Sequence, residues 1–330
     1  MKKILALVCV LVLALGCFAM AEEKTYNAWI DQNNEFIAGC AGKRIGIANI
    51  YLGDEWCKAV ADGFSEYAEI YGFEVNNQDG NLDHDTQAKQ IEQFITMQYD
   101  MILCDAANGE GIADILDEAR DAGIPVVCYD ANSVWDYKVA QVGTDNYGNG
   151  VKIGEMVKKY IEENLGGEAK IVILSLYQPH TILREEGFHS VIDQMPGVEV
   201  ITTQDSNGNR ETAANIITAI AEDYDIIYSV VPNGGLGAIA ALETLGKDPS
   251  SVKVFMPVSS EETYQMLRDE AAGKEGFLVG GTGSDGRLCS TRTLEAAGRY
   301  FLGIEQEVEQ VYDSIELTAE NINEYYPAAE

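Results

Sequence analysis

The sequence predicts an α/β protein built from two doubly wound lobes, each with a parallel sheet. With 330 residues, the chain is long enough for about two domains of ordinary size. Short β-rich runs alternate with helix-period segments, and the alternation restarts after residue 143. Runs such as 101–104 and 126–129 are apolar throughout, which is typical of parallel strands covered on both faces. Two sheets are favoured because one sheet of so many strands would exceed the usual size.

In the first half of the chain, short apolar runs predict strands, and the segments between them have the apolar spacing of helices. Most of the expected strands are followed by a helix, which is the connection that parallel neighbours need. We expect strands at 43–50, 74–77, 101–105, 125–130 and 139–143, and helices at 55–71, 86–97 and 112–122.

The second half repeats the pattern and adds a tail. We expect helices at 147–164, 182–195, 211–221 and 236–245, and strands at 170–175, 198–203, 226–230 and 252–256. In the tail we expect a strand at 277–281, a helix at 287–302 and an extended piece at 311–317.

The first 21 residues have the features of an export signal. Lys2 and Lys3 precede an apolar run from Ile4 to Leu15, and small residues around Ala21 offer a cleavage point. We therefore expect an exported protein, with a linker at 22–42, found in the periplasm. Alternatively, Cys17 ends a lipobox-like run and would be acylated, which would make the protein a cell-surface lipoprotein.

Composition excludes some partners. The formal net charge is −32, with 22 Lys and Arg against 54 Asp and Glu. Binding to nucleic acid or to anionic membranes needs clustered basic residues, so we expect neither. Five cysteines follow the signal, without the spacing of a zinc site, and two of them lie inside apolar strands.

Ligands of open parallel sheets lie beyond the carboxyl ends of the strands. The side chains expected there are carboxylates, amides and aromatics, which suit a neutral polyol because planar groups hold hydroxyls and rings cover C–H surface. The candidates at strand ends are Asn49, Tyr51, Asp54, Trp56, Asp105, Asn108, Asp130, Asn132, Thr144, Asp145, Asn146, Tyr177, His180, Asn233, Ser259 and Ser260.

Two motifs suggest other functions. The segment 281–286 matches GxGxxG, the dinucleotide fingerprint, but it lacks the later acidic residue, and a crossing between lobes explains it better. The segment 79–90 has the alternating oxygens of a calcium loop, without Gly at position 6 or Glu at position 12. The three His and the absence of GxSxG and HExxH give no catalytic residue. We therefore expect no cofactor, no metal and no enzyme activity.

Several segments, in this order and spacing, resemble the periplasmic sugar-binding proteins of the ribose/galactose type, which are type 1 periplasmic binding proteins and solute-binding components of ABC transporters. The segments that carry the resemblance are 45–49, 62–63, 87–92, 122–127 with Asp130, 142–146, 186–188, 237–242 and 317–321. The resemblance implies a three-segment hinge, with lobe 1 at 43–145 and 283–312 and lobe 2 at 146–282 and 313–330.

The resemblance also implies roles for single residues. Trp56 would stack on a sugar ring, Asp54, Asp105 and Asp130 would hold hydroxyls, and Thr144 would lie at the first hinge. In lobe 2, Arg184 or Ile182 would take the position of an Arg, and Asn233 would bind ligand. The residues that depart from the family pattern are Cys57, Ala131, Gly208 and Val258.

These observations predict an extracytoplasmic solute-binding protein. It would capture a small polar ligand, most simply a monosaccharide, by lobe closure and deliver it to the membrane permease of an ABC transporter. We expect a monomer. The alternatives are a sensor that presents its closed form to a chemoreceptor and an exported carbohydrate-active enzyme.

Overall fold

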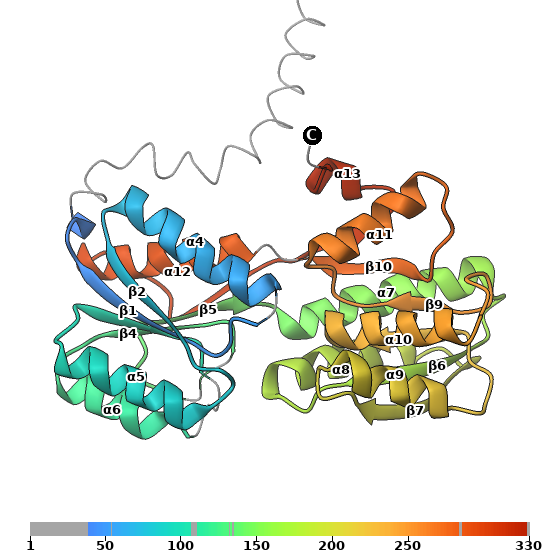
Figure 1. Ribbon diagram of the computed structural model, residues 1–330, viewed down its shortest axis with the longest axis horizontal. Helices are drawn as coiled ribbons and strands as arrows, with labels where there is room; N and C mark the ends of the chain where they lie inside the picture. Colours follow the sequence, from blue (N-terminus) through green and yellow to red (C-terminus); the bar gives the residue numbers. More distant parts are fainter. Residues whose placement is uncertain are drawn as a thin grey trace, which may run out of the picture.

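The chain folds into two lobes that lie side by side (Figure 1). The computed structural model describes residues 39–53, 55–106, 111–131, 133, 135–283 and 286–328. The predicted signal peptide, Cys17 and most of the predicted linker lie outside the described residues. The linker's described end already belongs to the fold, because Cys40 is fully buried in a hydrophobic core.

Lobe 1, as we use the term, is the first sheet with the helices on its faces. The sheet has six strands in the order β11-β5-β4-β3-β1-β2, and all neighbours are parallel. Its strands are β1 (Arg44–Asn49), β2 (Glu74–Asp79), β3 (Met101–Cys104), β4 (Val126–Tyr129), β5 (Ala140–Thr144) and β11 (Glu309–Tyr312). Its helices are α4 (Glu55–Tyr71), α5 (His84–Thr96), α6 (Ala113–Asp121) and α12 (Gly286–Phe301).

Helices cover both faces of this sheet, with α4 and α12 above and α5 and α6 below in the view of Figure 1. Alternate residues of β3 belong to different cores. Met101 and Leu103 pack in the core formed with α4 and α12, and Ile102 and Cys104 in the core formed with α5 and α6. Because side chains alternate across a strand, a strand covered on both faces is apolar at every position. This explains the continuous apolar runs of the sequence.

Lobe 2 is the second sheet with its helices. The order is β12-β10-β9-β8-β6-β7, and only the edge strand β12 is antiparallel among the pairs described. Its strands are β6 (Ala169–Ser175), β7 (Val198–Asp205), β8 (Ile226–Ser229), β9 (Lys253–Phe255), β10 (Leu278–Gly283) and β12 (Ile315–Thr318). Its helices are α7 (Asn146–Asn164), α8 (Pro179–Ile192), α9 (Arg210–Ala219), α10 (Pro232–Thr244), α11 (Glu261–Ala271) and α13 (Ile322–Tyr325). The prediction of two doubly wound lobes is confirmed.

Glycines let α7 and α8 approach each other closely. A Cβ atom on Gly150 would lie 1.9 Å from the Arg184 carbonyl oxygen, and one on Gly187 would lie 2.1 Å from the Tyr147 carbonyl oxygen. Both neighbours are backbone atoms, which cannot move aside as a flexible side chain can. The position of Arg184 relative to α7 therefore depends on these two glycines.

The chain passes between the lobes three times. The first crossing runs from β5 to α7, and the second from β10 to α12, where Ser284 and Asp285 lie outside the described residues. The third crossing separates β11 from β12, so the single extended piece expected at 311–317 is two strands in different sheets. The GxGxxG segment forms the second crossing, and its Gly281 fits closely against the Met256 carbonyl oxygen.

Two helices were not predicted, the short α13 and the longer α11. Helix α11 is polar and has few buried side chains, so its apolar spacing is weak. Its start is marked by a reciprocal cap between Ser260 and Thr263, in which Ser260 Oγ accepts from the Thr263 N–H and Thr263 Oγ1 accepts from the Ser260 N–H. Thr at the fourth position of a capping box is less usual than Glu or Gln, and this hid the signal.

Candidate ligand site between the two lobes

The carboxyl edges of the two sheets face each other. Strand β5 ends where the chain enters lobe 2, and the parallel strands β4, β3 and β1 therefore end at the same edge of lobe 1. Strand β10 ends where the chain returns to lobe 1, and β9, β8 and β6 run parallel to it. Residues that follow these strands in the two lobes are thus brought to a common region, where ligands of open sheets bind.

Lobe 1 places two carboxylates at this edge. Asp105 follows β3 and is 3% exposed, and its carboxylate accepts a 3.2 Å hydrogen bond from the Ala131 N–H. Asp130 follows β4 in a left-handed backbone conformation (φ 51°). Burial, reinforced by the charge of Asp130, raises the pKa of the Cys289 thiol, and the charge of Asp105 acts in the same direction. Both carboxylates therefore lie within electrostatic reach of one buried thiol.

Neighbouring side chains fix this edge. The Gln87 amide donates to the Ala48 carbonyl (3.0 Å) and to the Asp105 carbonyl (2.5 Å), which ties α5 to the ends of β1 and β3. The buried Tyr129 hydroxyl donates to Asn49 Oδ1 at 2.8 Å. Burial, together with the charge of Asp105, raises the pKa of Tyr129, so the phenol keeps its proton and remains a donor.

Three other lobe 1 candidates lie near the same edge, whereas Asp54 lies outside the described residues. Trp56 is in the first turn of α4, half-buried, and packs against the lobe 1 core. Thr144 is the half-buried last residue of β5 at the first crossing. Tyr51 is half-buried in the loop between β1 and α4, with its hydroxyl over the backbone of Gly53, where a Cβ atom would clash.

Lobe 2 brings Arg184 towards these carboxylates. Its Nε donates to Asn146 Oδ1 at 2.8 Å and one terminal nitrogen donates to the Val230 carbonyl at 3.1 Å. Burial lowers the pKa of Arg184, and the charge of Asp130 opposes that shift, so these two groups interact across the lobes. Of the alternatives Arg184 and Ile182, Arg184 is the one joined to other residues of this edge, while Ile182 is exposed.

Asn233 is placed differently from Arg184. It lies in the first turn of α10, and its Oδ1 accepts a 3.1 Å hydrogen bond from Arg210 Nε. The same guanidinium binds the Glu262 carboxylate through both terminal nitrogens, at 3.0 and 2.7 Å. Asn233 is therefore held by a cation of its own lobe.

Sequence reasoning missed two residues of this region. It did not select Arg210, whose partners are 23 and 52 residues away in the sequence. It also did not select Glu55, whose carboxylate accepts a hydrogen bond from lobe 2. The only sequence signal for Glu55 was its neighbours, Asp54 and Trp56. Asn146, which the sequence placed at a strand end, begins α7 and orients Arg184.

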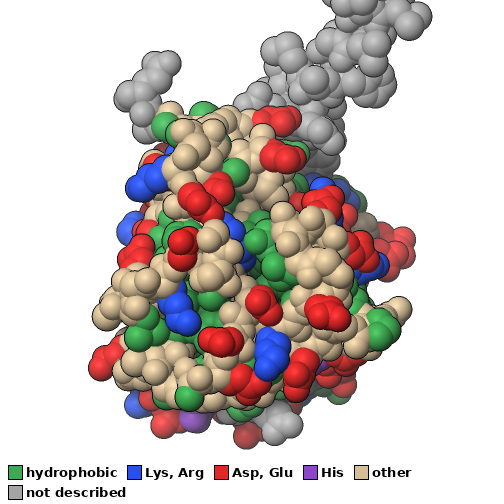
Figure 2. All heavy atoms as spheres, turned by 90° about the vertical axis from the view of Figure 1, so that its right-hand side faces the viewer, with side chains coloured by type: hydrophobic (Ala, Val, Ile, Leu, Met, Phe, Trp, Pro, Cys, Tyr) green, Lys and Arg blue, Asp and Glu red, His purple; other side chains and the backbone are tan. Residues whose placement is uncertain are grey.

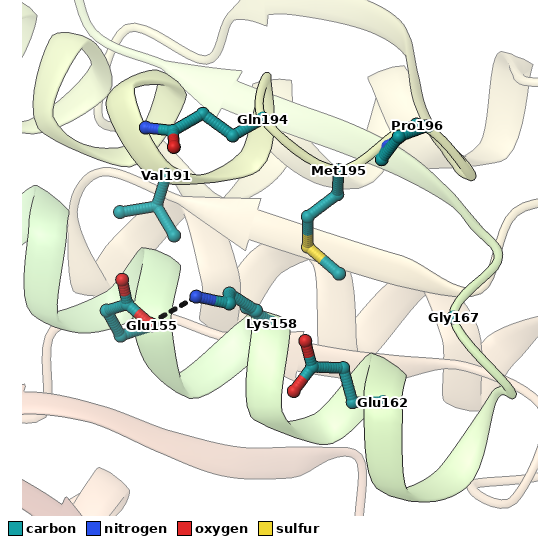
Figure 3. Close-up of a pocket in the computed structure, with 8 residues that line it drawn as sticks. All are labelled: Glu155, Lys158, Glu162, Gly167, Val191, Gln194, Met195 and Pro196. Atoms are coloured by element: carbon teal, nitrogen blue, oxygen red, sulfur yellow. Dashed lines mark hydrogen bonds and ion pairs between the residues drawn. The ribbon is translucent and has the colours of Figure 1, made fainter.

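A pocket lies elsewhere in lobe 2, between α7 and the end of α8 (Figure 3). Its volume is about 360 Å³, and Lys158 crosses part of it to pair with Glu155 at 3.2 Å. None of its lining residues is a predicted ligand contact. We place the candidate site between the lobes because the strand ends that carry Asp105 and Asp130 face lobe 2 and the charge of Asp130 acts on Arg184.

Other functional sites receive no support from the described residues. Among them, no three His, Cys, Asp or Glu side chains gather as a metal ion would need. The carboxylates of Asp79 and Asp83 instead accept backbone N–H groups of Asn81 and Thr86, as turn and cap residues do. On the face of the described chain seen in Figure 2, acidic and basic side chains are interspersed, without a continuous basic patch. Every helix in the described ranges is too short or too polar to span a membrane.

Comparison with known proteins gives consistent matches. The family described as periplasmic binding protein domain matches residues 45–287. The ribose import binding protein of Bacillus subtilis is 26% identical over 209 residues, 62% of this chain and 67% of that protein. The xylitol-binding protein of Mycolicibacterium smegmatis is 24% identical over 287 residues, 85% of this chain and 78% of that protein.

Solved structures share the fold. An ABC transporter solute binding protein of Bacillus halodurans C-125 with bound myo-inositol has a TM-score of 0.78 at 24% identity, covering 87% of this chain and 98% of its own. The binding component of the arabinose ABC transporter of Shewanella sp. ANA-3 has a TM-score of 0.78 at 19% identity, covering 86% and 94%. At these identities the likeness establishes the arrangement of two lobes.

Proposed function

The chain belongs to the periplasmic binding protein family, and from this premise we propose that it captures a small polar ligand, most simply a monosaccharide, between its lobes. The observation that carries the proposal is that the strand ends of lobe 1 place the carboxylates of Asp105 and Asp130 at the edge facing lobe 2, where the charge of Asp130 acts on the Arg184 guanidinium. Relatives named for ribose and xylitol binding support a ligand of this class.

The chemistry of the site suits a neutral polyhydroxyl compound. Ionised carboxylates accept hydrogen bonds from hydroxyl groups, and a guanidinium donates to ring or hydroxyl oxygens. Trp56, together with Tyr51, would cover the apolar C–H surface of a ring. An anionic ligand would be repelled by the carboxylates of lobe 1, so a phosphate or carboxylate ester is disfavoured.

Ligand contacts from both lobes would favour the closed arrangement. A ligand shifts such an equilibrium only by its differential affinity for the two states. Contacts to Asp130 and Arg184 together exist only when the lobes are close, which makes closure dependent on occupancy. We propose lobe boundaries at residues 145 and 283, with Thr144 at the first hinge and the remaining boundary between 312 and 313.

We further propose that the closed form delivers the ligand to an ABC-type permease, as the relatives' names suggest for them. Members of this family act outside the cytoplasm, and an export signal at residues 1–21 would bring the chain there. Acylation of Cys17 would anchor it to the membrane, and retention in the membrane fraction of wild type but not Cys17→Ser would identify the anchor. Neither a chemoreceptor partner nor enzyme activity gains support from the comparisons.

A thermal-shift screen over pentoses, hexoses and polyols tests the proposal. A ligand at 100 times its dissociation constant stabilises the protein by about 2.7 kcal/mol. Trp56→Ala should remove the shift, whereas Tyr137→Ala, which alters an aromatic ring that is 63% exposed, should keep it. The proposed sugar class fails if none of these compounds stabilises the wild type, and product analysis of the same mixtures would reveal any turnover.

A further inference from the structure

Between described residues, a hydrogen bond joins the lobes away from the chain crossings. Glu55 is the first residue of α4 in lobe 1, and Glu261 is the first residue of α11 in lobe 2. The Glu55 carboxylate oxygen Oε2 accepts a 3.0 Å hydrogen bond from the backbone N–H of Glu261. The two residues are 206 positions apart in the sequence, so only the approach of the lobes brings them together.

The N–H of Glu261 needs a partner from outside its own helix. The first N–H groups of a helix have no intrahelical acceptor. The reciprocal cap of α11 uses the hydroxyl of Ser260 for the N–H of Thr263, and the hydroxyl of Thr263 for the N–H of Ser260. The N–H of Glu261 remains, and Glu55 is its acceptor.

The electrostatics of this helix end favour a carboxylate from the other lobe. The side chains of Glu261 and Glu262 would repel Glu55, but each is bound by an arginine of lobe 2. Arg268 pairs with Glu261, and Arg210 binds both oxygens of Glu262. With these charges balanced, the positive end of the helix dipole attracts a third carboxylate.

Helix α11 is firmly attached to the rest of lobe 2. Arg268 is 7% exposed and donates to the Tyr326 carbonyl at 2.9 Å. The rings of Tyr264 and Tyr326 stack with centroids 4.1 Å apart and an interplanar angle of 10°. The N-terminus of α11 therefore moves together with the rest of lobe 2, and a contact to it holds the whole lobe.

We propose that Glu55 is a positioning residue that holds the lobes together by binding the N-terminus of α11, and so slows release of the captured ligand. The inference rests on the proposed capture of a ligand between the lobes. The hydrogen bond itself joins Glu55 and Glu261, neither of which is a candidate ligand residue. Because the contact forms after the lobes approach, it should affect the dissociation rate of the ligand more than the association rate.

The experiment measures the contact itself and its effect on binding. Hydrogen exchange of the Glu261 amide is followed by NMR in the purified full-length exported protein, with and without the tightest sugar of the thermal screen. Stopped-flow fluorescence gives the rate constants for that sugar. The variants are Glu55→Ala and Glu55→Gln. The control is Glu69→Ala, another exposed glutamate of α4.

Glu55→Ala should speed exchange of the Glu261 amide by roughly tenfold or more and raise the sugar's dissociation rate by roughly 3- to 10-fold, the loss expected for an exposed charge-assisted hydrogen bond. Glu55→Gln keeps an acceptor without the charge, so its exchange and dissociation rates should lie between those of wild type and Glu55→Ala. Glu69→Ala should match wild type in both rates. Unchanged amide exchange in Glu55→Ala would overturn the contact, and an unchanged dissociation rate would overturn its role in retention. If no sugar binds the wild type but exchange still responds to Glu55, the proposed ligand class fails and the contact stands.

Discussion

The two lobes present opposite chemistry to each other. Lobe 1 offers the carboxylates of Asp105 and Asp130 at strand ends, and lobe 2 offers the guanidinium groups of Arg184 and Arg210. The guanidinium groups are already bound within lobe 2, to Asn146 and the Val230 carbonyl for Arg184 and to Asn233 and Glu262 for Arg210. Lobe 1 thus supplies acceptors, and lobe 2 supplies donors held in a fixed frame.

This difference bears on how the site works. A side chain that is already oriented loses little rotational freedom when a ligand arrives, so lobe 2 is suited to fix the geometry of the ligand. The carboxylates of lobe 1 would accept hydrogen bonds from the hydroxyl groups of the ligand. The contrast predicts that charge changes matter most in lobe 1, and that changes of geometry matter most in lobe 2.

The largest effect should follow a charge change in lobe 1. Asp130→Asn keeps the shape and tolerates the left-handed backbone, but removes a charged acceptor. We expect the dissociation constant for the sugar to rise by about 100-fold, equivalent to about 2.7 kcal/mol. Calorimetric titration measures this, with the exposed Asp223→Asn as control. Equal affinity of Asp130→Asn and wild type would break the contrast.

A packing change should be the next largest, and it should act on lobe 2. In Gly187→Ala the new methyl group would lie 2.1 Å from the Tyr147 carbonyl oxygen, so α7 and α8 must separate. Overpacking of this kind costs about 1–3 kcal/mol of unfolding free energy, which urea denaturation would register. Gly276→Ala, whose methyl group has 3.5 Å to its nearest neighbour, is the matched control and should be close to neutral.

Arg184→Lys tests whether the geometry of the lobe 2 side chain, and not only its charge, determines affinity. Lysine keeps the charge but loses the planar fork that joins Asn146 and the Val230 carbonyl. We expect roughly tenfold weaker binding, an effect of about 1.4 kcal/mol, with the fold retained. Arg292→Lys on the exposed side of α12 serves as the control. Full affinity in Arg184→Lys would mean that the charge alone matters in both lobes.

The last prediction concerns the pH dependence of stability. Burial and the nearby charge of Arg184 lower the pKa of His180 to about 3, against an ordinary value near 6.5. The unfolded chain takes up this proton first, so the contribution of His180 to stability is complete above about pH 6.5 and is lost as the pH falls toward 3. His180→Gln should lose less stability than wild type between pH 7.5 and 4.5 in urea titrations.

Much of the fold could be predicted because its signals are local. Inner strands such as β3, β4 and β8 are apolar runs, and the order of the strands and helices along the chain led to two lobes. The exceptions have physical reasons. Helix α11 has a polar sequence and an unusual cap, and the piece at 311–317 divides because the chain crosses between lobes at residues 313 and 314.

Only part of the candidate site could be predicted from the sequence. Asp105 and Asp130 follow apolar strands directly, so their position at a sheet edge could be predicted. The choice between Ile182 and Arg184 could not be made, because it depends on how closely α7 packs on α8. Arg210 and Glu55 were missed because their partners are far away in the sequence.

Local sequence specifies which residues are buried in strands and which polar groups follow the strands, since hydrophobic periodicity and turn chemistry act over a few residues. Which of those groups come near one another depends on the tertiary fold. The influence of the Asp130 charge on Arg184 and the hydrogen bond of Glu55 with the first N–H of α11 depend on the approach of two separately folded lobes. Electrostatic and hydrogen-bond contacts depend on distances in space, and no local pattern in the chain records them.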